Sequence, residues 1–207
     1  MLTERQRTLA DMLLDVNAIQ FGAFKLKLHD KHPEAPLSPI YINLRTLRSN
    51  VKAMHIASDA YEELASGLIF DCYADVPTAA TPLVAVLASI TGRPMISPSL
   101  EQKSHGTGAR IDGVYSKGNT ALLIDDLITR AESKLEAIRV LESAGLTVRN
   151  VIVLVDREQG GIQELRNRGY DCRAALPLSE LLENYKSTGR ITNDDYLRTK
   201  HYLEVNT

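Results

Sequence analysis

The chain has 207 residues, a length typical of one domain, and its contents of 44% hydrophobic and 24% charged residues favour a packed core over disorder. A formal net charge of −2 gives no basic excess for nucleic acid or an anionic membrane surface. No apolar run approaches the roughly 18 residues of a membrane-spanning helix, and the N-terminus lacks a signal-peptide pattern. We therefore expect a cytoplasmic protein with no membrane or nucleic-acid partner, and reduced, buried thiols at Cys72 and Cys172.

The first part of the chain is predicted to contain two helices and two strands. The first helix, over residues 3–18, is amphipathic. Residues 21–28 and 38–45 are predicted strands, separated by a loop with two prolines. A second helix is predicted over residues 51–64.

From residue 68 onward, strand patterns alternate with helix patterns. Strands are predicted over residues 68–73, 94–96, 110–115, 120–124, 148–155 and 172–176. Helices are predicted over residues 79–90, 130–144, 160–168, 178–185 and 193–203. This alternation predicts an α/β fold, with a mainly parallel central sheet flanked by helices, in a single domain over residues 1–207. The polar segment at residues 97–110 is a loop of unusual length, which is typical of functional or disordered segments.

The stretch at residues 120–134 is the most informative part of the chain. An apolar run at residues 121–124 predicts a buried strand, and Asp125 and Asp126 follow it directly. Open α/β sheets bind ligands at the carboxyl ends of their strands, so two carboxylates there favour Mg²⁺ or a sugar diol as the ligand. A solvated acidic turn is the alternative that the pair by itself leaves open.

The turn after the acidic pair carries hydroxyl groups that suit a phosphate. Thr129 and Ser133 flank the predicted start of a helix, where backbone amides attract anions. Thr129 and Glu132 also match the T-x-x-E capping box, which places a carboxylate beside those amides. A phosphate cradle and a plain helix cap both fit this pattern.

A second group of polar residues, Asp-Arg-Glu-Gln-Gly-Gly at residues 156–161, follows the next strand of the predicted sheet. Parallel strands end at the same edge of a sheet, so we expect Arg157 to lie near the acidic pair. Its guanidinium suits an anionic ligand with planar acceptors. A salt bridge with Asp156 or Glu158 is the alternative.

These two stretches resemble motifs of one family. Residues 122–129 resemble the diphosphoribosyl-binding motif of the type I phosphoribosyltransferases, and residues 156–161 resemble a segment of the orotate phosphoribosyltransferase domain of uridine monophosphate synthases. The resemblance implies that Asp125 and Asp126 hold the ribose hydroxyls of phosphoribosyl diphosphate (PRPP), with Mg²⁺ bound directly or indirectly. It also implies that Thr129 and Ser133 hold the 5′-phosphate and that Arg157 helps to hold orotate.

The resemblance extends over about residues 21–185 and implies a small N-terminal hood. On this basis residues 1–48 include the hood elements, and residues 49–207 form the core and the C-terminal helices. Lys27 matches the family's base-contacting lysine, and Tyr41 and Ile42 match positions that flank the pyrimidine.

Two further segments resemble family loops. Residues 75–83 resemble the pyrophosphate loop, where a cis peptide is typical, and residues 101–106 resemble the mobile catalytic loop. Lys103 and His105 match residues that reach into the neighbouring subunit's site and neutralise the departing pyrophosphate; by residue type alone, a histidine such as His105 is more often a surface residue. The resemblance thus implies a homodimer that shares the loop at residues 99–110 across its interface and converts orotate and PRPP into orotidine 5′-monophosphate.

Several positions depart from the family pattern. Ser99 and Leu100 stand where the family usually has arginine and lysine, and Arg130, Ala131 and Glu132 stand where it usually has small residues that include a glycine. Orotate phosphoribosyltransferase is the predicted function, and a catalytically impaired homologue with a binding, regulatory or assembly role is the alternative. A Rossmann nucleotide-binding module is disfavoured because G-x-G-x-x-G is missing.

Overall fold

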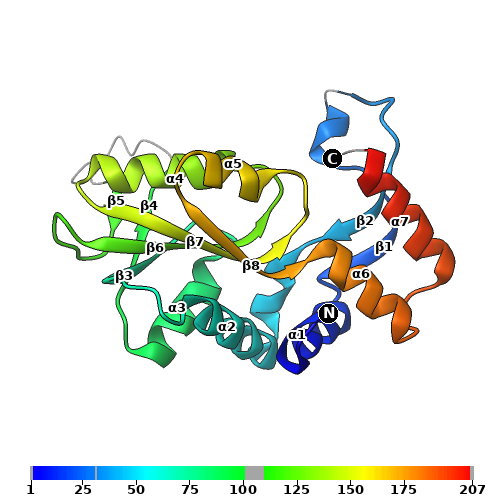
Figure 1. Ribbon diagram of the computed structural model, residues 1–207, viewed down its shortest axis with the longest axis horizontal. Coiled ribbons are helices and arrows are strands. Elements are labelled where there is room, and N and C mark those ends of the chain that lie inside the picture. The colour runs from blue at the N-terminus through cyan, green and yellow to red at the C-terminus, as the bar shows by residue number, and fades with distance from the viewer. Residues whose placement is uncertain (1, 31, 101–109, 206–207) are drawn as a thin grey trace.

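The computed structural model describes residues 2–30, 32–100 and 110–205. The chain folds around a six-stranded sheet with the strand order β5-β4-β3-β6-β7-β8 (Figure 1). Only the β4–β5 pair of this sheet is antiparallel in the part of the chain that is described. The strands are β3 (Cys72–Asp75), β4 (Met95–Pro98), β5 (Ile111–Asp112), β6 (Thr120–Ile128), β7 (Thr147–Asp156) and β8 (Asp171–Pro177). The predicted α/β fold with a mainly parallel sheet is confirmed.

Helices cover both faces of this sheet (Figure 1). Helices α2 and α3 lie on one face with α1 beside α2, whereas α4 and α5 lie on the other. The bounds are α1 (Glu4–Asp15), α2 (Val51–Ala65), α3 (Thr81–Thr91), α4 (Glu132–Ser143), α5 (Gly161–Asn167), α6 (Leu178–Ser187) and α7 (Asn193–Val205). No described helix is both long enough and apolar enough to cross a membrane.

Strand β6 is buried on both faces, and its alternate side chains enter two different hydrophobic cores. Leu122 and Ile124 pack in the core on the side of α2 and α3, whereas Ala121 and Leu123 pack in the core on the side of α4. All four are at most 1% exposed. A strand covered on both sides needs apolar residues at every position, which explains the unbroken apolar run in the sequence.

The hood is a two-stranded antiparallel sheet of β1 (Ile19–Phe24) and β2 (Ser38–Ile42). The predicted strand at residues 21–28 extends too far, because the chain turns after Phe24 into the 3-10 helix η1 (Lys27–Asp30). The imidazole of His29 accepts a hydrogen bond from the amide of Leu26 at 2.8 Å and holds this turn. Helix α7 packs against β2, and Arg198 of α7 donates to the carbonyl of Gly22 at 3.0 Å.

Other predicted boundaries are wrong as well: the first helix ends at Asp15 rather than at residue 18, and the strand predicted at residues 110–115 is limited to β5 (Ile111–Asp112). Strand β3 begins at Cys72 rather than at residue 68, because the amide of Leu68 still donates to the carbonyl of Ala65 in the turn that ends α2. The predicted strand at residues 38–45 ends at Ile42 and is followed by the 3-10 helix η2 (Leu44–Ser49). Strand β6 runs on to Ile128, so the acidic pair lies inside it. The two cysteines are free and buried, as predicted.

The end of β6 is fixed to α2 by Tyr61, whose buried hydroxyl donates to the carbonyl of Asp125 at 2.9 Å. Replacing Tyr61 with Phe leaves that carbonyl buried without this donor, and we expect the free energy of unfolding to fall by about 1–2 kcal/mol in urea titrations. Tyr41→Phe is the control, because the side chain of Tyr41 is 37% exposed. Equal losses in the two variants would contradict the role of the buried hydrogen bond.

Candidate active site

The acidic pair lies near the carboxyl end of β6 and is withdrawn from solvent. Asp125 is 4% exposed and Asp126 is 7% exposed, so the alternative of a solvated acidic turn is wrong. Lys134 of α4 contacts Asp125, whereas the charge of Asp126 acts most strongly on Tyr61 of α2, which packs on the other face of the sheet. Each carboxylate therefore meets a different set of neighbours.

Asp125 points toward α4, where Lys134 is its partner. The Nζ atom of Lys134 lies 2.6 Å from Oδ2 of Asp125, and the two side chains are 5% and 6% exposed. The other carboxylate oxygen, Oδ1, accepts from the amide of Asp126 at 2.8 Å. Burial raises the pKa of the Asp125 carboxyl above its ordinary value, and the ammonium of Lys134 acts in the opposite direction.

Lys134 also ties the strand to the helix that follows it. Its Nζ donates to the carbonyl of Leu127 at 2.5 Å and lies 3.4 Å from the hydroxyl oxygen of Ser133. One ammonium group thus joins a carboxylate, a main-chain carbonyl and a hydroxyl around the turn between β6 and α4. The resulting ion pair is buried, and removing one partner alone would leave an uncompensated charge.

Asp126 has a different environment on the side of Tyr61. Its Oδ1 accepts from the amide of Leu127 at 2.8 Å, and no cation contacts its carboxylate in the described part of the chain. Burial raises the pKa of Tyr61, and the charge of Asp126 adds to this effect more than that of Asp125. Asp126 is therefore the acid of the pair that keeps an uncompensated negative charge.

The turn at residues 129–133 leads directly into α4, whose N-cap is Ala131. Because the helix begins only at Glu132, Thr129 is not at the N-cap position and no side chain caps the helix. The predicted capping box between Thr129 and Glu132 is therefore wrong. The amide of Ala131 instead donates to Oε2 of Glu164 in α5 at 3.4 Å. A carboxylate from another helix thus lies at an amide that an anion would use.

Gly161, at the start of α5, packs tightly against this turn. A Cβ atom at this position would lie 2.6 Å from Cγ1 of Ile128 and 2.9 Å from the carbonyl oxygen of Thr129. Only a residue without a side chain allows α5 to come this close to the turn. The second glycine of the segment at residues 156–161 therefore has a packing role.

Arg157 lies beside the end of β6, since its amide donates to the carbonyl of Ile128 at 2.9 Å. Its side chain lines a cavity of about 290 Å³ together with residues of α6 and α7, and the lining includes neither Asp125 nor Asp126. The alternative of a salt bridge with its neighbours is wrong within the described residues, because Glu158 bonds to Ser179 and Asp156 accepts from the amide of Glu158.

The guanidinium of Arg157 keeps unused donor capacity. Its Nε is buried without a hydrogen-bond partner among the described residues. Burial lowers the pKa of Arg157, and nearby Tyr202 of α7 acts in the opposite direction. A half-buried cation with a buried, unpaired Nε donor favours binding of an anionic ligand.

Further residues predicted for the site lie in the hood and in the predicted pyrophosphate loop. Tyr41 stacks on Phe24 with ring centroids 5.5 Å apart, and Ile42 pairs with Ile19 across the hood. Lys27 begins η1, and its side chain lies outside the described part of the structure. The peptide between Pro77 and Thr78 is cis, as expected for this loop.

The predicted catalytic loop falls mostly outside the described residues, and this includes Lys103 and His105. The base of the segment is described: the amide of Ser99 donates to the carbonyl of Arg110 at 2.7 Å. Leu100 packs against the core on the α4 side of the sheet.

Comparisons with known proteins decide the family. The orotate phosphoribosyltransferase of Methanopyrus kandleri is 35% identical over 193 residues, which cover 92% of this chain and 100% of that protein. The chain belongs to the orotate phosphoribosyltransferase family. No profile of a known protein family matches the sequence.

Other members of the orotate phosphoribosyltransferase family are longer than this chain. The bifunctional enzyme PyrF/PyrE of a Nostoc species is 33% identical over 94% of this chain, which spans 40% of its length. The structure of Leishmania donovani UMP synthase superposes with a TM-score of 0.84 at 34% identity, over 96% of this chain and 42% of that one. The chain thus spans about two fifths of the length of these relatives.

Sequence reasoning missed two residues of the candidate site in this orotate phosphoribosyltransferase homologue. Lys134 precedes Ile138 and Leu141 by four and seven residues, a spacing that places it on the buried face of α4. A lysine on that face needs a buried partner, and the acidic pair after the buried apolar run is a candidate, because Glu132 and Glu136 lie off the buried face of the helix. Glu164 lies 33 residues beyond Ala131, and no local pattern indicates their contact.

The negative charge of Glu164 beside the turn is expected to weaken phosphate binding there. We expect Glu164→Gln to tighten PRPP binding about 3- to 5-fold in isothermal titration, because it removes a negative charge near the amide of Ala131. Glu136→Gln, on the exposed face of α4, is the matched control and should leave the affinity unchanged. Weaker binding in Glu164→Gln than in the control would contradict this electrostatic effect.

Proposed function

We propose that the protein is an orotate phosphoribosyltransferase, which forms orotidine 5′-monophosphate and pyrophosphate from orotate and PRPP in pyrimidine nucleotide biosynthesis. The observation that carries the proposal is the match along almost the whole chain to relatives named orotate phosphoribosyltransferase. The buried acidic pair of β6 and the partly unpaired Arg157 beside the end of that strand support it.

The proposed reaction needs positioning and charge neutralisation, and no covalent nucleophile. The bond between C1′ of PRPP and the pyrophosphate oxygen breaks, the ribose passes through an oxocarbenium-like transition state, and a ring nitrogen of orotate bonds to C1′. The strand end that carries the acidic pair, Asp125 and Asp126, is the proposed binding site of the ribose hydroxyls. Thr129 and Ser133 donate to the 5′-phosphate at the start of α4.

The base is proposed to bind between the hood and the end of β7. Arg157 can donate to the carboxylate of orotate, while Tyr41 and Ile42 flank the pyrimidine ring and Lys27 contacts it. Lys103 and His105 are proposed to neutralise the charge on the departing pyrophosphate in the partner subunit's site.

Magnesium fits this site as an ion that arrives with PRPP. The described residues contain no group of three or more His, Cys, Asp or Glu side chains that could hold a metal. Mg²⁺ usually keeps several waters and binds through one or two carboxylates plus substrate phosphates, and Asp125 and Asp126 supply the only carboxylates that we assign to it. When bound, Mg²⁺ would neutralise charge on the diphosphate.

A homologue with weak catalysis and a binding, regulatory or assembly role is the second candidate. Two observations favour it: the carboxylate of Glu164 lies at the amide of Ala131, and Lys134 is paired with Asp125. The residues at Ser99 and Leu100 add no positive charge to the base of the predicted catalytic loop. Turnover separates the two candidates.

Turnover is measured as the loss of orotate in the presence of PRPP and Mg²⁺. We expect orotidine 5′-monophosphate to form, and Asp126→Asn to lower kcat/KM for PRPP by about 100-fold, because two charge-assisted hydrogen bonds to the ribose are weakened. Asp59→Asn, on the exposed face of α2, is the control and should not change the rate. PRPP binding without product would support the second candidate, and neither binding nor product would contradict both.

We also propose that the chain acts as one domain, in the cytoplasm, and as a homodimer that shares the loop at residues 99–110. Light scattering at micromolar concentration should give twice the chain mass of 22.9 kDa. A mixture of Lys103→Ala and Asp126→Asn chains should regain activity if each site takes the loop from its partner. A monomer that is fully active would contradict the shared site.

A further inference from the structure

We propose that Lys134 is a positioning residue that withdraws Asp125 from ligand contact and leaves Asp126 as the carboxylate that receives the ribose hydroxyls of PRPP. This inference rests on the proposed function and divides the roles of the two acids. It also assigns Lys134 the task of orienting Ser133 toward the 5′-phosphate.

The hydrogen bonds of Asp125 support the first part. Both of its carboxylate oxygens already have donors, since Oδ1 accepts from the amide of Asp126 at 2.8 Å and Oδ2 lies 2.6 Å from Nζ of Lys134. The carboxylate is 4% exposed and faces α4. A carboxylate has about four acceptor sites, but those of Asp125 are buried, and a ribose hydroxyl that reached Oδ2 would compete with the ammonium and weaken the compensation of the two buried charges.

Asp126 has the opposite character. Its charge acts on Tyr61 of α2, on the face of the sheet opposite Lys134, and within the described residues its carboxylate accepts only from the amide of Leu127. It therefore keeps acceptor capacity for a diol, and its negative charge strengthens such hydrogen bonds. The two neighbouring acids thus differ in function because they face different sides of one strand.

The contact of Lys134 with Ser133 supports the second part of the proposal, that Lys134 orients the Ser133 hydroxyl. Its Nζ lies 3.4 Å from Oγ of Ser133, within reach of a weak hydrogen bond that the ammonium can only donate. A Ser133 hydroxyl that accepts from Lys134 directs its own proton away from the ammonium. An outward-pointing hydroxyl at the first turn of α4 can donate to a phosphate.

The test compares PRPP affinities by isothermal titration in the presence of Mg²⁺. Asp125→Asn alone leaves Lys134 buried without its partner, so the double variant Asp125→Asn with Lys134→Met replaces the pair without an uncompensated charge. We expect Asp126→Asn to weaken PRPP binding about 100-fold. The double variant Asp125→Asn with Lys134→Met, called the neutral pair below, should weaken it only about 3- to 10-fold. Lys134→Met alone should bind PRPP more weakly than the neutral pair, because it leaves the Asp125 carboxylate unpaired beside the site.

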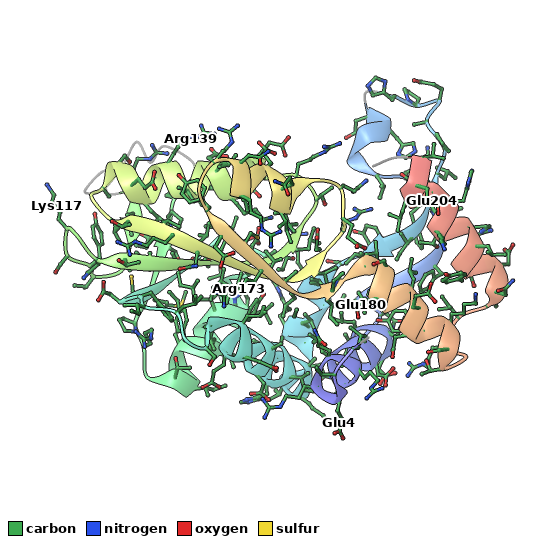
Figure 2. The ribbon with its side chains drawn as sticks, in the orientation of Figure 1. Glu4, Lys117, Arg139, Arg173, Glu180 and Glu204 are labelled. Atoms are coloured by element: carbon green, nitrogen blue, oxygen red, sulfur yellow. The ribbon has the colours of Figure 1, made fainter. Side chains whose placement is uncertain are left out.

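Lys117→Met is the matched control for the lysine substitution, since Lys117 (labelled in Figure 2) is exposed and precedes the amino end of β6, whereas the acidic pair lies near the carboxyl end of that strand. It should leave the PRPP affinity unchanged. Equal weakening by the neutral pair and by Asp126→Asn would overturn the division of roles, as would Lys134→Met binding as tightly as the wild type. A wild-type chain that does not bind PRPP would overturn the proposed function itself, and this inference with it.

Discussion

Two carboxylates lie within a strand that is covered on both faces, and this burial is the constraint on which the candidate site depends. A buried charge is tolerated only with a partner or with hydrogen bonds. Lys134 provides the partner for Asp125 from the α4 side, and Tyr61 holds the main chain at the same residue from the α2 side. The end of β6 is therefore fixed from both layers of helices before the turn at residues 129–133 begins.

The second half of the candidate site depends on the C-terminal helices. The main chain of Arg157 lies beside the end of β6, but its side chain lies among residues of α6 and α7. Helix α7 also contacts the hood, where Arg198 donates to the carbonyl of Gly22. Helix α7 thus contacts both the hood and the cavity lined by Arg157, the arginine that we propose for orotate binding. Contacts between residues far apart in sequence therefore fix these elements relative to one another.

Local patterns were sufficient for the fold and for placing the acidic pair near the carboxyl end of a buried strand. The apolar run of β6 and the alternation of strands and helices follow from burial on both faces of a parallel sheet, and the structure bears them out. The exact ends of helices and strands were harder to predict from the sequence. Thr129 and Glu132 match a capping box, but β6 extends to Ile128 and leaves Thr129 too far from the helix start at Glu132 to cap it.

The contacts that tune the site could not be derived from adjacent residues. The pairing of Lys134 with Asp125 spans a turn, and it becomes visible only when the lysine is placed on the buried face of α4. The contact of Glu164 with Ala131 joins α5 to the N-cap of α4 on the same face of the sheet. The charge around the acidic pair is therefore a property of the folded chain, and the motif alone does not specify it.

A crystal structure of the chain with PRPP bound would test the division between the two acids most directly. The account predicts that the ribose hydroxyls lie within hydrogen-bond distance of Asp126 while Lys134 remains paired with Asp125. Ribose hydroxyls held by Asp125, with the ammonium of Lys134 displaced from it, would contradict the account.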